Sequence, residues 1–350
     1  MSTEIKLTQF SKGGGCGCKI APSVLQQIVQ STNGLSFNNL LVGNESSDDA
    51  AVYQINDEEA IVSTTDFFLP IVDDPFDFGR IAAANAISDV YAMGGTPLMA
   101  IAILGFQIEK LPLEIAQRIL EGGQSICKEA NIPLAGGHTI DSTDPIYGLA
   151  VTGRIDIKNL KKNIGAKPGD VLLLTKPLGT GLLATALKRG LLEKIHYQSL
   201  LQQMTSLNNI GIELAKIAGV SAMTDVTGFG LLGHLIEMAE GSDVSIELTY
   251  TNILKMDGAD EYLKQRTIPD ATFRNWNSYS KKVQFAKGVN VMEAFNLLPD
   301  PQTNGGLLIA VEPGSLNEVK SIFLKSGLHK HLEPIGICIE KAEKTIMVSI

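Results

Sequence analysis

Short apolar runs alternate along the chain with longer segments in which apolar residues recur at helical spacing. The runs at 60–65, 99–104 and 171–175 have the length and the apolar character of buried strands. Segments 115–130 and 200–217 repeat apolar residues every three to four positions, which predicts amphipathic helices. Because strands and helices alternate, the pattern predicts an α/β or α+β fold.

A polar stretch near the middle of the chain predicts a domain boundary. Four lysines gather there, between Asp156 and Asp170, ahead of the turn signal Pro168-Gly169. A second polar region, 250–289, has poor periodicity and is expected to form a long irregular excursion. The lysines before the turn are Lys158, Lys161, Lys162 and Lys167.

The composition is that of a globular protein of about two domains. The chain has 350 residues, 44% of them apolar and 19% charged. Its 29 basic and 38 acidic residues give a net charge of −9, which argues against a general nucleic-acid binder or a protein bound to anionic membranes. No apolar run is long enough for a membrane span, and residues 1–10 do not resemble a signal peptide. Four cysteines form no disulfide framework, so we expect a reducing, cytoplasmic setting.

Segment 11–19 is the most unusual stretch of the sequence. It holds four glycines and places Cys16 and Cys18 between Lys12 and Lys19. Ammonium groups nearby lower the pKa of a thiol, so one interpretation is a mobile, reactive segment. A disordered tail with incidental cysteines fits the composition equally well. Metal binding is a weaker third alternative, because a lone Cys-x-Cys lacks a second pair of ligands.

Carboxylates recur at the ends of apolar segments. Asp48 and Asp49 come just before one such run, Asp66 closes the run at 61–65, and Asp225 closes another. Strand ends are where α/β proteins gather their ligands, and several converging oxygens would suit Mg²⁺. The alternative for each residue is an ordinary turn or cap, since Asp favours both.

The segment 79–93 reads as a helix with an unusual polar stripe. Asn85, Ser88 and Asp89 share one face, and the opposite face is apolar. Few long charged side chains flank the stripe, unlike an ordinary solvated face. The pattern therefore favours a site for a metal or phosphate over a solvated surface.

A dinucleotide-binding pattern provides an alternative function. The stretch from Gly228 to Gly233 satisfies G-x-G-x-x-G, and Glu247 follows about 20 residues later, so a nicotinamide-dependent oxidoreductase is possible. Against it, Asp225 would place a negative charge beside the pyrophosphate. The chain has no Gly-Lys dipeptide and therefore no Walker A loop.

Two further glycine-containing stretches are of interest. At 135–139, Gly136 and Gly137 would let backbone N–H groups approach a phosphate, and His138 could assist. The stretch 302–306 indicates a turn that enters a strand, and the pattern assigns it no role.

Taken together, six motifs closely resemble those of the selenophosphate synthetase family. Their order and spacing match over nearly the whole chain, and the Cys-Gly-Cys-Lys element separates this family from the aminoimidazole ribonucleotide synthetase-like ATP enzymes that share its fold. The motifs are Gly15-Cys16-Gly17-Cys18-Lys19, Asp48-Asp49-Ala50-Ala51-Val52-Tyr53, Ser63-Thr64-Thr65-Asp66-Phe67-Phe68, Asn85-Ala86-Ile87-Ser88-Asp89, Ala135-Gly136-Gly137-His138 and Thr224-Asp225-Val226-Thr227-Gly228-Phe229-Gly230.

The resemblance implies a two-domain fold of the aminoimidazole ribonucleotide synthetase-like type. A flexible glycine-rich segment at 1–47 would precede an ATP- and metal-binding domain at 48–157 and a C-terminal domain at 168–350. It also implies a cytoplasmic homodimer that uses Mg²⁺ and converts ATP, selenide and water to selenophosphate, AMP and phosphate. The product would supply selenocysteine and selenouridine synthesis, with selenium arriving free or from a delivery protein.

The resemblance also implies roles for individual residues. Cys16 would be the reactive residue and Lys19 the essential cation. The metal-binding positions would be Asp49, Asp89 and Asp225. The ATP-contacting positions would be Lys19, Ser46, Ser47, Asp48, Asp66, Asp89, Gly137, His138 and Thr139, with 137–139 coming from the partner subunit.

Overall fold

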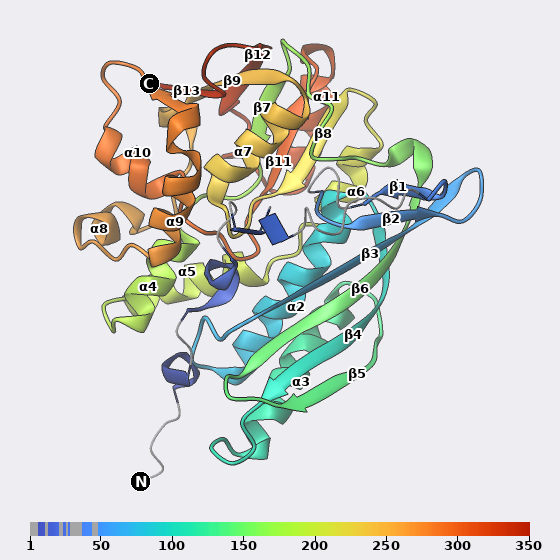
Figure 1. Ribbon diagram of the computed structural model, residues 1–350, viewed down its shortest axis with the longest axis vertical. Coiled ribbons are helices and arrows are strands. Elements are labelled where there is room, and N and C mark those ends of the chain that lie inside the picture. Colours follow the sequence, from blue (N-terminus) through green and yellow to red (C-terminus); the bar gives the residue numbers. More distant parts are fainter. Residues whose placement is uncertain (1–5, 11–12, 21–23, 26, 29–36, 44–47) are drawn as a thin grey trace.

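The computed structural model describes residues 6–10, 13–20, 24–25, 27–28, 37–43 and 48–350, which form two α/β units (Figure 1). Ser46 and Ser47 lie outside the described residues. The first unit is built on a six-stranded sheet, ordered β1-β2-β3-β6-β4-β5, in which only β4 and β5 run parallel. Its strands are β1 (Leu40–Val42), β2 (Ala51–Gln54), β3 (Glu59–Phe68), β4 (Thr96–Phe106), β5 (Leu134–Asp141) and β6 (Ile146–Asp156).

Helices α2 (Pro75–Ala92) and α3 (Leu113–Glu129) cover one face of this sheet, and the opposite face of the described strands carries no helix (Figure 1). The Asp74 side chain caps α2 by accepting from the Asp77 N–H at 2.9 Å. The two helices approach closely through glycines. A Cβ on Gly79 would lie 1.9 Å from the Ile119 carbonyl oxygen. This close packing holds α2 rigidly against its neighbours.

The second unit is built on a seven-stranded sheet with the order β10-β13-β9-β12-β7-β11-β8. Helix α7 packs on one face, and α6 and α11 cover the other. The strands are β7 (Val171–Leu174), β8 (Val220–Asp225), β9 (Val244–Thr249), β10 (Val283–Phe285), β11 (Leu307–Val311), β12 (Gly336–Glu340) and β13 (Ile346–Ser349). The helices are α4 (Thr180–Lys188), α5 (Lys194–Thr205), α6 (Ile210–Ala215), α7 (Gly230–Gly241), α8 (Ala259–Lys264), α9 (Asp270–Tyr279), α10 (Val291–Leu297) and α11 (Leu316–Lys325).

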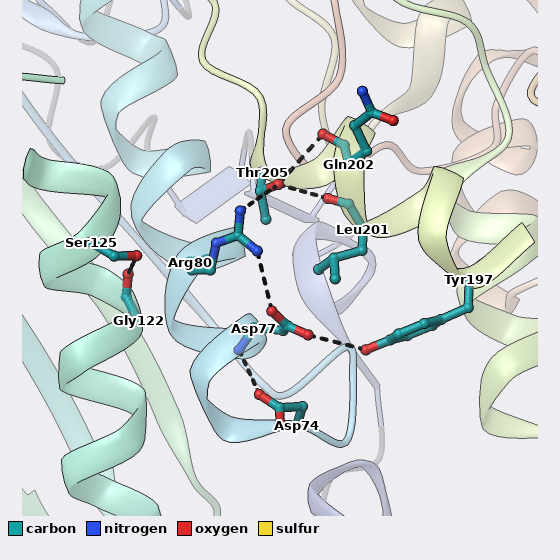
Figure 2. A network of polar contacts seen from close by, with 9 residues as sticks. All are labelled: Asp74, Asp77, Arg80, Gly122, Ser125, Tyr197, Leu201, Gln202 and Thr205. Carbon is teal, nitrogen blue, oxygen red and sulfur yellow. Dashed lines mark hydrogen bonds and ion pairs between the residues drawn. The ribbon is translucent and has the colours of Figure 1, made fainter. Parts of the chain in front are cut away.

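Helix α2 also joins the two units. Figure 2 shows Arg80 of α2 reaching Asp77 at 3.3 Å and the Thr205 hydroxyl of α5 at 3.4 Å. The Tyr197 hydroxyl of α5 donates to Asp77 at 3.4 Å. Burial, with Asp74 nearby, raises the pKa of Asp77. The opposite end of α2 contacts β8, so the helix lies between the first sheet and the second unit.

The described part of the N-terminal segment packs next to the site and contains two 3₁₀ turns. Turns η1 (Leu7–Phe10) and η2 (Gly15–Cys18) belong to the N-terminal segment. The Thr8 hydroxyl donates to Asp73 at 2.6 Å, and the Gly15 N–H donates to the Leu69 carbonyl at 3.0 Å. The described part of the segment is therefore attached to the loop that precedes α2. Turn η3 (Ile157–Asn159) follows the last strand of the first sheet.

Most elements agree with the sequence pattern, and the α/β fold class is confirmed. The predicted strands are β3, β4 and β7, and the predicted helices 79–93 and 115–130 are α2 and α3. The prediction of one helix over 200–217 is wrong, because the chain breaks between α5 and α6. There the Asn208 amide donates to the Ser88 hydroxyl and the Gly305 carbonyl, both at 2.8 Å. Long-range partners outweigh local helical spacing at this point.

The prediction of an irregular excursion over 250–289 is also wrong. The region holds η4 (Tyr250–Asn252), α8, α9, η5 (Ser280–Lys282) and β10. Each element is too short to show a clear period in the sequence. Helix α9 nonetheless buries Ala271, Asn275 and Tyr279 at intervals of four residues.

Candidate active site

The polar stripe of α2 is buried against the second unit. The Ser88 hydroxyl donates to Asp225, at the end of β8, at 2.6 Å. Asn85 donates to Asp66 of β3, and Asp89 accepts from the Thr64 hydroxyl at 2.5 Å. Strand alternation points Thr64 and Asp66 toward α2. Asp66 lies inside β3, not at its end as the sequence pattern suggested.

Three carboxylates influence one another at this junction, the buried Asp89 and Asp225 and the half-buried Asp49. Burial, then Asp225, raises the pKa of both Asp49 and Asp89 well above the usual value. Burial raises the pKa of Asp225 to about 6, against the opposing effects of the Ser88 hydrogen bond and of Lys19. The cluster concentrates negative charge that a cation would relieve.

The carboxylates match the donor chemistry of a magnesium site. Asp49 accepts from the Thr224 hydroxyl through Oδ1 at 2.9 Å, while its buried Oδ2 has no hydrogen-bond partner. An unpartnered carboxylate oxygen is the kind of ligand that Mg²⁺ takes. As the side chains stand, no group of three or more His, Cys, Asp or Glu residues within the described part of the chain is arranged to hold an ion. Metal binding would thus require the carboxylates to draw together.

Lys19 supplies positive charge to the same place. Burial lowers the pKa of its ammonium, but Asp66, followed by Cys16, Asp89 and Asp225, raises it further, so the net shift is upward. Lys19 therefore remains a cation. A permanent positive charge beside carboxylates can compensate an incoming phosphate.

Cys16 is buried at the junction of the two units. Its side chain is 1% exposed, its N–H donates to the Thr303 hydroxyl oxygen at 3.0 Å, and its Sγ donates to Asn85 Oδ1 at 3.1 Å. Burial, then Asp66, raises the pKa of the thiol well above its usual value despite Lys19. The expectation that neighbouring lysines would lower this pKa is wrong for this arrangement, because burial and carboxylates outweigh one ammonium. Residues 13–20 are also not a disordered tail, because they include the 3₁₀ turn η2 and its hydrogen bonds.

Cys18 is less deeply placed than Cys16. Its Sγ donates to the Gly15 carbonyl at 2.9 Å, and burial raises the pKa of its thiol. The Gly17 carbonyl between the two cysteines accepts from Arg274 of α9 at 2.9 Å. The turn is thus held from the second unit as well as the first.

The remaining predicted site residues divide into two groups. Asp48 Oδ1 accepts from the Asn163 N–H at 2.8 Å, next to Asp49. Gly137, His138 and Thr139 are exposed on β5, the edge strand farthest from β2. Within one chain the structure does not bring these three residues to the carboxylates.

The G-x-G-x-x-G stretch lies between a strand and a helix, as the dinucleotide-binding pattern predicts, but there is no room beside it for a dinucleotide. Gly228 follows β8 and precedes α7, yet a Cβ on Gly228 would lie 2.5 Å from the Cys16 carbonyl oxygen and 3.0 Å from Lys19 Cδ. The N-terminal segment occupies the space that a pyrophosphate would need. The glycine therefore serves close packing, and the oxidoreductase alternative loses its structural support.

Sequence reasoning missed several residues that hold this site together. Thr64 and Thr224 orient Asp89 and Asp49, and Thr303 contacts Cys16. The first two lie inside motifs that the sequence analysis noted, one residue or two from a candidate carboxylate. Thr303 lies 287 residues from its partner, so only the turn signal at 302–306 marked it.

Two family models match nearly the whole chain. The N-terminal domain of AIR synthase related protein matches residues 47–155, and its C-terminal domain matches residues 167–349. Selenide, water dikinase of Photorhabdus laumondii is 51% identical over all of this chain and 99% of that protein. The enzyme of the same name from Haemophilus influenzae strain Rd is 51% identical over the full length of both.

The chain belongs to the selenide, water dikinase family. Solved structures of proteins with lower sequence identity have the same fold as this family member. Thiamine-monophosphate kinase from Stenotrophomonas maltophilia aligns with a TM-score of 0.64 at 18% identity, over 95% of this chain and 96% of that one. The hydrogenase maturation protein HypE of E. coli aligns with a TM-score of 0.63 at 19% identity, over 83% and 82%. None of the helices in the described part of the chain could cross a membrane.

Proposed function

We propose that this chain is a Mg²⁺-dependent selenophosphate synthetase that converts ATP, selenide and water to selenophosphate, AMP and phosphate. The observation that carries the proposal is the convergence of Cys16 and Lys19 with Asp49, Asp89 and Asp225 at one buried junction. Family membership supports it, because relatives carrying the name selenide, water dikinase match over their full length. The product would serve selenocysteine and selenouridine synthesis in the cytoplasm.

Asp49, Asp89 and Asp225 would hold the metal. When bound, Mg²⁺ neutralises charge on the phosphates and on the three carboxylates. Thr64, Ser88 and Thr224 each donate to one of these carboxylates and so fix its orientation. The acidic site can therefore accept an anionic nucleotide only together with the metal.

Cys16 and Lys19 would handle the selenium and the charge that develops on the phosphate. Selenide is a soft anion that neither Mg²⁺ nor carboxylates would bind, whereas the protonated Cys16 thiol can donate a hydrogen bond to it without any change of oxidation state. In the described arrangement Cys16 is a buried thiol, so it must leave the Asn85 contact before it meets selenide. Lys19, kept cationic by Asp66, would stabilise phosphate oxygens during transfer.

We also propose a homodimer built on the helix-free face of the first sheet. Phe67, Met99, Ile101 and Ile140 are between 44% and 53% exposed there. His138 pairs in register with Ile103 of β4, so the two side chains point to the same face. A second copy covering this apolar face would bring residues 137–139 to the ATP of its partner.

Phosphorus NMR tests the proposal directly. The protein is incubated anaerobically with ATP, Mg²⁺ and selenide under reducing conditions, and parallel samples omit selenide or Mg²⁺. We expect a phosphorus–selenium species together with AMP and phosphate, and only in the complete mixture. If ATP is hydrolysed equally with and without selenide and no such species forms, the proposed function is wrong.

A further inference from the structure

The turn at 302–306 lies directly against Cys16. Thr303 Oγ1 accepts the Cys16 N–H at 3.0 Å. The neighbouring Asn304 N–H donates to Asn85 Oδ1 at 2.7 Å, and this same oxygen accepts from the Cys16 Sγ at 3.1 Å. The backbone and the thiol of Cys16 are therefore both connected to this turn, one directly and one through Asn85.

The turn is itself fixed by buried hydrogen bonds. The Thr303 N–H donates to the Thr180 hydroxyl oxygen at 3.1 Å. Asn304 has a left-handed backbone with φ of 48°, and its side-chain amide donates to the Met204 and Ser206 carbonyls at the C-terminal end of α5, at 2.9 and 2.8 Å. Lys176 Nζ donates to the Asn304 carbonyl at 2.9 Å. Because each bond comes from a different part of the second unit, the turn has little freedom to move.

The N-terminal segment fits this turn too closely to have a side chain at Gly15. The residue has a φ of +53°, and a Cβ there would lie 2.4 Å from Thr303 Oγ1 and 2.5 Å from Ile71 Cδ1. A glycine is required both by the backbone angle and by the contact. The N-terminal segment and the 302–306 turn are therefore closely complementary in shape at Gly15.

We propose that Thr303 and Asn304 are positioning residues that hold Cys16 in a defined place next to the carboxylate site. The proposal rests on the proposed function, in which Cys16 handles the selenium. Thr303 holds the backbone of the Cys16 turn, and Asn304 holds Asn85, which accepts from the thiol. Each turnover would thus return Cys16 to the same position relative to the ATP site, and losing this contact would impair selenide use without changing ATP affinity.

The substitution Thr303→Val tests the direct contact. It keeps the shape of the side chain and removes the acceptor, leaving the buried Cys16 N–H unpaired. We expect Cys16 to be alkylated by iodoacetamide about tenfold faster, measured by peptide mass spectrometry, because the buried position is less favoured. We also expect selenide-dependent AMP formation to fall about tenfold in kcat with an unchanged KM for ATP. Thr303→Ser restores the hydroxyl and should return both values toward those of the unsubstituted chain.

The matched control is Thr267→Val. This threonine is also fully buried in the second unit and also loses a hydrogen bond, to the Leu182 carbonyl at 3.1 Å, but it does not contact the Cys16 turn. Both the alkylation rate and the kcat should stay within about twofold of the unsubstituted protein. A change equal to that of Thr303→Val would show a general loss of stability and overturn the proposal.

Gly15→Ala disturbs the same contact through the N-terminal segment and leaves the sequence of the second unit unchanged. It should reproduce both effects even if Thr303→Val fails to fold. Unchanged alkylation in the folded variants overturns the proposal whether or not the enzyme is active, and faster alkylation with normal kcat overturns the positioning role. Absence of selenophosphate from the unsubstituted protein instead overturns the proposed function, and the alkylation rates still decide whether the turn holds Cys16.

Discussion

Cys16 and its neighbours show how the surroundings of a residue change the chemistry that its sequence suggests. The lysines beside Cys16 in the sequence favour one interpretation among three, a reactive thiol with a lowered pKa. In the structure Asp66 is the largest charged influence on its pKa, and it acts upward together with burial. Sequence distance conceals this, because Asp66 and Thr303 lie far from Cys16 along the chain. A reactive thiolate at this position therefore needs either movement of the segment or neutralisation of the carboxylates.

Substitutions of Cys16, Cys18 and Lys19 should affect turnover to different degrees. Cys16→Ser should abolish selenide-dependent AMP formation, because a hydroxyl has a much higher pKa and is a poor nucleophile. Cys18→Ser should be milder, since the family resemblance assigns the reactive position to Cys16 and the Sγ of Cys18 donates to the Gly15 carbonyl. Lys19→Ala should remove turnover while ATP still binds weakly. The assay is AMP production with ATP affinity measured in parallel, and full activity in Cys16→Ser would refute this ranking.

The carboxylates should respond to substitution in opposite ways with and without metal. Asp49→Asn, Asp89→Asn and Asp225→Asn each remove one charge from the cluster and keep its shape. We expect Mg²⁺-dependent turnover to fall about a hundredfold or more. Metal-free thermal stability should rise, because burial and the neighbouring carboxylates both disfavour the charge that the amide removes. Unchanged turnover and Mg²⁺ affinity in all three variants would remove the metal assignment.

The burial of Asp225 gives the stability of the folded chain a pH dependence with a definite sign. The pKa of Asp225 is about 6 in the folded chain against an ordinary value of 3.8, so between these values the folded state binds more protons than the unfolded state. The stability contributed by protonation is lost as pH rises through about 6. The melting temperature without metal should therefore decline between about pH 4 and 6 and level off at higher pH, and Asp225→Asn should flatten the decline. A melting temperature that rises over this range would contradict the assignment.

Among the elements, α2 has the largest share in building the site. Its polar stripe was visible in the sequence because Asn85, Ser88 and Asp89 repeat at helical spacing. The sequence did not show which residues the stripe contacts, since Asp225 and Asn208 belong to the second unit. Local periodicity predicts the long helices α2 and α3 well, which have 18 and 17 residues. It fails for 200–217 and 250–289, where buried contacts with distant residues and short helices decide the structure.

The close packing of α2 on α3 predicts a strong effect of a single methyl group. Gly79→Ala adds a Cβ that would lie 1.9 Å from a backbone oxygen, so the helices must separate. We expect a loss of about 2 kcal/mol in the free energy of unfolding, after allowing for the better helix propensity of alanine. Gly314→Ala, which meets nothing within 4 Å, is the control and should be neutral. Equal unfolding curves for both variants in urea would show that α2 and α3 can adjust.

For the whole molecule, the two family-model matches, residues 47–155 and 167–349, follow the two sheets of the structure. The candidate site lies where these units meet, with Asp49, Asp66 and Asp89 from one and Asp225 from the other. Among the predicted site residues that the structure describes, only the exposed residues 137–139 stand apart, on the edge strand β5. If they contact ATP, as the family resemblance implies, a second copy of the chain must bring them to it.

Mixing two impaired variants tests this shared site. His138→Ala should weaken ATP turnover through the partner, and Asp89→Asn should abolish it within its own subunit. In a mixed dimer one site would combine intact residues from both chains, while the other would carry both substitutions. After co-refolding or co-expression in equal amounts, about half of the dimers would be mixed, so about a quarter of the unsubstituted activity should return. Ile101→Lys, placed on the exposed apolar face, should prevent dimerisation in sedimentation experiments and abolish this recovery. No recovery in dimers shown to be mixed would mean that residues 137–139 do not act across the interface.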